Sequence, residues 1–262
     1  MTLVVAPLSL ALYAWATALL WRARQHATSS HIAVWVILGA IAAHAVYLHL
    51  VVFRNGGSTL SLLYVVNVVA LVMSIFVTVA GFRLPVQKLL LLVVPLSILA
   101  LVAALTIEPG HVNAPDMSRA LLAHILVSLT AYSTLMLAAC QSVLLAVLER
   151  QLKSPGRQPI GWLPPLETME QLLVAMLWVG LALLTGAILT GFLFLEDMFQ
   201  QNVAHHIVIT SLSWLIYAFF LAGRIFFGWR GLTAVRWTLV GFAFLVIGYL
   251  GSKFVLEYIL VR

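Results

Sequence analysis

The chain has 262 residues, of which 63% are hydrophobic and only 8% are charged. A soluble domain of this length needs far more polar surface, so the composition excludes a soluble globular protein and indicates one surrounded mostly by lipid. The net charge of +6 is spread along the chain, and no basic run is dense enough to follow a phosphate backbone. We therefore expect no nucleic-acid partner.

Eight apolar runs follow one another along the chain, and each approaches the roughly 20 residues that a helix needs to cross a bilayer. Helices are expected because a lipid-exposed backbone must satisfy its own hydrogen bonds. Composition does not change along the chain, so the prediction is an all-α, polytopic integral membrane bundle forming a single domain over residues 1–262. The predicted spans are 3–20, 32–53, 60–82, 87–107, 120–148, 169–195, 207–227 and 234–260.

The distribution of positive charge predicts the orientation of these spans. The first run lacks a basic leader and ends at Trp21-Arg22, which favours a retained span over a cleaved signal. If the N-terminus lies outside, ten Lys and Arg residues fall on the inner side and four on the outer side. Since Lys and Arg concentrate in cytoplasmic loops, both termini are predicted to face the outside.

Several kinds of chemistry find no support in the sequence. Cys140 is the only cysteine, which excludes an internal disulfide, a Cys-x-x-Cys redox centre and covalent c-type haem attachment. No phosphate-binding loop, Gly-x-Ser-x-Gly elbow or His-Glu-x-x-His motif is present, so we expect no enzyme activity. All carboxylates fall in loops or at span ends, which disfavours a proton-coupled pump.

Histidines are the ionisable residues that the predicted spans do contain. His44 lies near the middle of the second span, His124 in the first turns of the fifth, and His206 opens the seventh beside His205. An imidazole is a good axial ligand for haem iron, and two of them on facing helices can hold a porphyrin between them. The alternative is that each is only hydrogen-bonded to a neighbouring helix.

The spacing of polar residues indicates which way the seventh span faces. His206, Thr210, Ser213 and Tyr217 recur at helical spacing and form one polar stripe. We therefore expect His206 to face the bundle. His205, which shares its face with apolar residues, is expected to face lipid or the interface.

Several segments resemble the cytochrome c assembly (CcsA/CcmC-like) membrane protein family, with a similarity that is strongest over about 35–262. They are Ala43-His44-Ala-Val-Tyr, His124-Ile-Leu-Val-Ser-Leu-Thr-Ala-Tyr132, His206-Ile-Val-Ile-Thr-Ser-Leu-Ser-Trp214, Gly228-Trp229-Arg230-Gly231 and Tyr249-Leu-Gly251. Two further segments are similar to the YpjD/HemX-type branch of that family: Leu163-Pro-Pro-Leu-Glu-Thr-Met-Glu170 and Gly251-Ser-Lys-Phe-Val-Leu-Glu257.

The resemblance implies a multi-pass protein of the bacterial inner membrane that handles haem at the outer face. The implied partners, besides membrane lipid, are other cytochrome c biogenesis or haem-pathway proteins. The implied cofactor is haem, with His44, His124 and His206 as its binding residues and with His124 and His206 on the iron. The family also places a Trp-rich loop between two ligating histidines, whereas Glu196 to His205 of this chain contains no tryptophan.

Three functions follow as hypotheses. The first is a haem-binding protein of cytochrome c biogenesis that works by ligation at the outer face and not by bond-making. The second is an accessory or regulatory membrane protein, linked like HemX-type relatives to control of haem synthesis, that has lost haem binding. The third is a transporter of small solutes or metal ions, which the sequence supports least because no broken-helix pair is visible.

Overall fold

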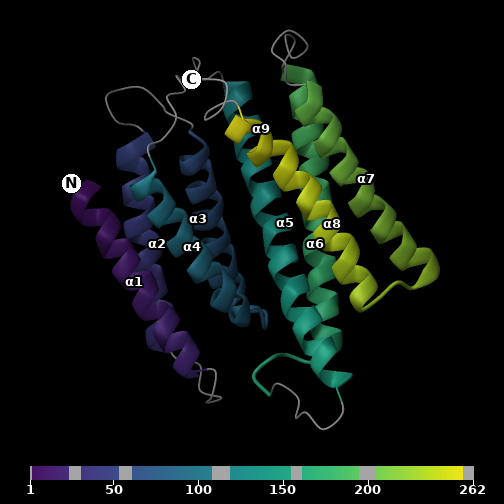
Figure 1. Ribbon diagram of the computed structural model, residues 1–262, viewed down its shortest axis with the longest axis horizontal. Helices are drawn as coiled ribbons and strands as arrows, with labels where there is room; N and C mark the ends of the chain where they lie inside the picture. The colour runs from purple at the N-terminus through teal and green to yellow at the C-terminus, as the bar shows by residue number, and fades with distance from the viewer. Residues whose placement is uncertain are drawn as a thin grey trace. The chain divides into compact units, whose positions relative to one another are not determined.

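The computed structural model describes residues 2–23, 31–52, 61–107, 119–154, 161–194 and 204–255. These residues form helices and no strand. Eight of the helices are long and apolar enough to cross a membrane, which confirms the predicted polytopic helical membrane protein (Figure 1). Large apolar side chains lie on the outer surface, for example Trp35 with 73% and Phe226 with 79% of their surface exposed. Lipid is the solvent that tolerates such a surface.

The contacts between helices group the chain into two compact units, Met1–Pro115 and Asp116–Arg262. In the first unit, α1 packs against α2 and α4, and α3 packs against the same two helices, so that the four form a closed ring. The helices are α1 (Thr2–Ala23), α2 (His31–Val52), α3 (Leu62–Ala80) and α4 (Leu90–Thr106), the last preceded by the short 3₁₀ helix η2 (Gln87–Leu89).

The second unit has the same ring order. Here α5 packs against α6 and α8, and α7 packs against the same two helices. The helices are α5 (Arg119–Leu152), α6 (Leu166–Phe194), α7 (Ala204–Phe227) and α8 (Leu232–Val246), followed by the π-helix η3 (Ile247–Gly251) and the short α9 (Ser252–Phe254). The prediction of a single domain stays a prediction, since the two units are defined by contacts alone.

Small and polar residues hold the helices of each unit together, as expected where lipid offers no hydrophobic drive for helix association. In the first unit, Ser74 of α3 and Ser97 of α4 share a hydrogen bond of 3.0 Å. In the second, α5 and α6 approach so closely that a Cβ at Gly180 would lie 2.5 Å from Cδ2 of Leu135. Gln141 of α5 also donates to the Met169 carbonyl at 3.0 Å. These contacts fix which faces of the helices point inward.

Two spans differ from the prediction in length or regularity. The predicted fifth span ends at residue 148, whereas α5 continues to Leu152 and has 34 residues. At 1.5 Å per residue it is about 51 Å long, which exceeds the roughly 30 Å hydrocarbon core of a bilayer. The predicted eighth span is not one regular helix, because its α-helix ends at Val246 and a π-helix follows.

Candidate functional site

His124 lies half-buried in the second turn of α5, and α6 determines how its ring is held. Its Nδ1 lies 3.0 Å from the Thr190 hydroxyl. That hydroxyl also lies 2.8 Å from the Gly186 carbonyl, which can only accept a hydrogen bond, so the Thr190 proton points there. Thr190 must then accept a hydrogen bond from Nδ1–H of His124. The lone pair of the imidazole is consequently on Nε2.

The surroundings of Nε2 suit a histidine that presents a lone pair. The hydroxyl of Ser128, one turn along α5, lies 3.5 Å from Nε2. At Cε1, the ring carbon between the two nitrogens, a Cβ at Gly191 would lie 3.3 Å away, so the glycine lets α6 pass close to the ring. Histidines that bind metals characteristically donate their second ring N–H to a fixed acceptor, as His124 does to Thr190.

His206 lies in the first turn of α7, but its side chain and that of His205 fall outside the described residues. The rest of the predicted stripe is confirmed. Thr210, Ser213 and Tyr217 are all buried, whereas Leu212, on the face predicted to meet lipid, is 40% exposed. The loop that lacks tryptophan, residues 195–203, also lies outside the described residues.

His44, in the first unit, is completely buried and has a partner on each ring nitrogen. Its Nε2 lies 3.2 Å from Oδ1 of Asn67 on α3, and its Nδ1 lies 3.4 Å from the hydroxyl of Tyr13 on α1. The Asn67 amide group donates to the Leu63 and Ala100 carbonyls, both at 2.8 Å. These two bonds fix the orientation of the amide, so that its Oδ1 accepts and Nε2 of His44 is protonated.

The two histidines are therefore in opposite tautomeric forms, which bears on whether they suit haem iron. His124 has its lone pair on Nε2 and holds its other nitrogen by a hydrogen bond, an arrangement that fits an axial ligand if iron takes the place of the Ser128 hydroxyl, 3.5 Å from Nε2. His44 has a proton on Nε2, and its Nδ1 accepts from Tyr13. To bind iron it would have to give up one of these hydrogen bonds, so its predicted ligand role stays a prediction.

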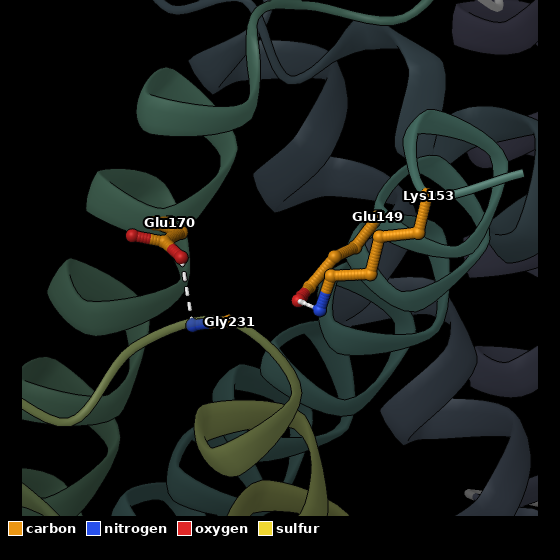
Figure 2. A network of polar contacts seen from close by, with 4 residues as sticks. All are labelled: Glu149, Lys153, Glu170 and Gly231. Carbon is orange, nitrogen blue, oxygen red and sulfur yellow. Dashed lines mark hydrogen bonds and ion pairs between the residues drawn. The ribbon is translucent and has the colours of Figure 1, made fainter. Parts of the chain in front are cut away.

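Figure 2 shows a second polar cluster in the same unit, around Gly231, the residue that precedes α8. The backbone N–H of Gly231 donates to Oε1 of Glu170 on α6 at 2.7 Å. Glu149, in the last turn of α5, pairs with Lys153 at 2.7 Å. Its carboxylate also faces Gly231, because a Cβ there would lie 2.8 Å from Oε2 of Glu149. Both glutamates are 8% exposed.

This cluster connects the ends of three elements and was only partly foreseen. The sequence placed Glu149 and Glu170 at span ends, and that is where they lie. It contained no signal that both would meet the turn between α7 and α8. Gly231 is required there for two reasons, since its φ of +59° favours glycine and a side chain would press against Glu149. We interpret the cluster as a structural connection between α5, α6 and that turn.

Comparisons with known proteins identify a family and several relatives. The family model of the cytochrome C assembly protein matches residues 8–260. The inner membrane protein YpjD of Escherichia coli K12 is 28% identical over 222 residues, which are 84% of this chain and 84% of YpjD. An uncharacterized 28.8 kDa protein of Azospirillum brasilense is 30% identical over 140 residues, 52% of each chain. No solved structure matches the chain significantly.

Proposed function

Since the chain belongs to the cytochrome C assembly protein family, we propose that it is an inner-membrane protein of cytochrome c biogenesis that binds haem and positions it at the outer face. The single observation that carries the proposal is the contact between His124 and Thr190. Because the Thr190 hydroxyl donates to Gly186, it accepts from Nδ1–H of His124, and this bond orients the ring as in metal-binding histidines; Nε2, which lies 3.5 Å from the Ser128 hydroxyl, is the atom that would bind iron. Haem would supply the iron, and the protein would supply ligation and orientation.

We propose His124 as one axial ligand and His206 as the other. Both belong to the second unit, and in the sequence each histidine opens a set of polar residues at helical spacing, His124 with Ser128 and His206 with Thr210. The proposed orientation, with both termini outside, places these two histidines in the outer half of the membrane. His44 belongs to the first unit and is retained as a predicted second, deeper ligand.

The test is the absorption spectrum of the full-length protein, purified in detergent after expression with ample haem. We expect a Soret band that His124→Ala and His206→Ala each weaken and that the double variant abolishes. His49→Ala, which replaces another histidine of the spans, serves as the matched control and should leave the band unchanged. A colourless wild-type protein, or a double variant with undiminished haem, would contradict the proposal.

Thr190→Val provides a finer test of the same geometry. It removes the acceptor of Nδ1–H while leaving the ligand in place, and valine has nearly the same shape as threonine. We expect haem to remain bound with a shifted reduction potential, because the hydrogen bond on the second ring nitrogen tunes the basicity of the ligand. An unchanged potential would mean that Thr190 does not orient a ligand.

A second candidate function is that of an accessory or regulatory protein which keeps the family scaffold without haem. The absence of tryptophan between Glu196 and His205 favours it, because that loop is where the resemblance places an aromatic haem platform. Affinity capture distinguishes the two. A stable protein partner that is retained equally by the His124→Ala, His206→Ala double variant supports the regulatory role.

A further inference from the structure

Four aromatic rings gather around the turn that joins α7 and α8, at the end of α8 opposite to α9 (Figure 1). The indoles of Trp229 in the turn and Trp237 on α8 lie parallel, with their centroids 5.9 Å apart. Phe219 of α7 meets both indoles edge to face, at 5.4 Å and 5.1 Å. Phe227 stacks on Trp229 at 6.1 Å. These four side chains form a continuous aromatic cluster.

The backbone of the turn holds Trp229 in this aromatic cluster. Gly228 has a φ of +67°, a conformation that favours glycine and lets the chain turn after α7. The Trp229 ring packs on Gly223, where an added Cβ would overlap the ring. Arg224 donates to the Trp229 carbonyl at 3.1 Å. The aromatic cluster is therefore a fixed part of the fold.

Although its members pack together, the aromatic cluster lies on the outer surface of the unit. Phe219 has 55% and Phe227 has 77% of its surface exposed, and Trp229 and Trp237 are partly exposed. Tryptophan is enriched where acyl chains meet headgroups, because its ring is apolar and its N–H is polar. Neither indole N–H has a hydrogen bond to another described residue. Both can therefore donate to a headgroup.

Two arginines adjoin the aromatic cluster. Arg230 follows Trp229 in the turn, Arg236 precedes Trp237 on α8, and both arginines are exposed. Neither has a hydrogen bond or an ion pair with another residue that the structure describes. Arg236 is the fifth residue of a candidate membrane span, about 6 Å along it at 1.5 Å per residue. An unpaired guanidinium there is stable only if its long side chain reaches water or phosphate.

The acidic residues near this turn do not neutralise the two arginines. Glu149 pairs with Lys153, and Glu170 accepts from the N–H of Gly231. Both glutamates are buried, whereas the arginines are exposed. The surface of the turn thus carries a positive charge with no countercharge among the described residues. Such a surface is complementary to an anion.

We propose that the α7–α8 turn binds an anionic phospholipid, with Arg230 and Arg236 attracting its phosphate and the aromatic cluster contacting its acyl chains. A guanidinium matches phosphate oxygens both in charge and in geometry. A soluble anion would use the arginines alone, whereas a phospholipid also covers the exposed rings beside them. The lipid site is separate from the proposed haem ligands, because His206 opens α7 and this turn follows the last residue of the same helix.

Quenching of tryptophan fluorescence by lipids with brominated acyl chains tests the proposal on the full-length protein in vesicles. The vesicles consist of phosphatidylcholine with a minor fraction of brominated lipid, either phosphatidylglycerol or phosphatidylcholine. We expect brominated phosphatidylglycerol to quench the wild type more strongly. Arg236→Gln should lower the preference for phosphatidylglycerol about fivefold, the effect of one basic side chain near a membrane surface. Arg83→Gln, which replaces an exposed arginine of the first unit, is the matched control and should retain the preference.

The double variant Trp229→Phe, Trp237→Phe shows where the lipid binds. It keeps two aromatic rings but removes the local reporters, so the excess quenching by phosphatidylglycerol should disappear. Equal quenching of the wild type by both lipids would overturn the proposal, as would an excess that persists in Arg236→Gln or in the double variant. Since both lipids are compared in one preparation, the result does not depend on haem. A colourless protein with the expected lipid preference would contradict the proposed function alone.

Discussion

The hydrogen bonds around His44 predict how strongly the first unit depends on one asparagine. Asn67 of α3 accepts from His44 of α2 and donates to the Ala100 carbonyl of α4, so it connects three of the four helices in that unit. We expect Asn67→Ala to destabilise the protein, because the variant leaves the buried Nε2–H of His44 without its acceptor and removes the bond to the Ala100 carbonyl.

The magnitude follows from the two hydrogen bonds between helices that are lost. Such bonds in membrane proteins contribute about 0.6 kcal/mol on average and up to about 1.7 kcal/mol each. Their sum predicts a decrease of about 1 to 3 kcal/mol in the free energy of unfolding. In a double-mutant cycle with His44→Ala, the coupling energy should be about 0.6 to 1.7 kcal/mol.

The assay is reversible unfolding of the purified protein in mixed micelles as the fraction of denaturing detergent is raised. Thr17→Val is the matched control, since the Thr17 hydroxyl donates to the Tyr13 carbonyl of its own helix at 2.9 Å. It should change the free energy by less than about 0.5 kcal/mol. A coupling energy of zero between His44 and Asn67 would refute the hydrogen-bond network inferred here.

Two further predictions concern glycines. Gly231→Ala should destabilise by about 2 to 4 kcal/mol, since it combines the cost of a positive φ with a clash at the Glu149 carboxylate. Gly228→Ala, with φ +67° but open space around the added Cβ, should show the backbone cost alone, about 1 to 2 kcal/mol. If both variants lowered the free energy of unfolding in detergent by the same amount, a clash at Glu149 would be excluded. Gly180→Ala should destabilise by about 1 to 3 kcal/mol, because its Cβ would overlap a buried leucine of α5. Gly186→Ala meets only an ordinary contact of 3.5 Å and should be neutral or stabilising by up to about 1 kcal/mol in the same measurement.

The histidines show how far sequence reasoning reached at the candidate site. Their positions within spans, and the polar face of α7, could be read from spacing, because a helix repeats every 3.6 residues. The state of each ring could not. Thr190 lies 66 residues from His124 in the chain, and Asn67 lies 23 residues from His44. Only the packing of helices brings these partners together and decides which nitrogen carries the proton.

The sequence by itself determined that this is a helical membrane protein with eight spans, because the bilayer imposes the length, apolar composition and helical form of every span within that span. Tertiary structure alone decided which polar groups meet. It joined Glu149 and Glu170 at Gly231, and it brought Nδ1 of His124 to the Thr190 hydroxyl. The physical reason is that the lipid around a span determines the length and composition of that span, whereas a polar contact depends on the rotation and approach of helices far apart in the chain.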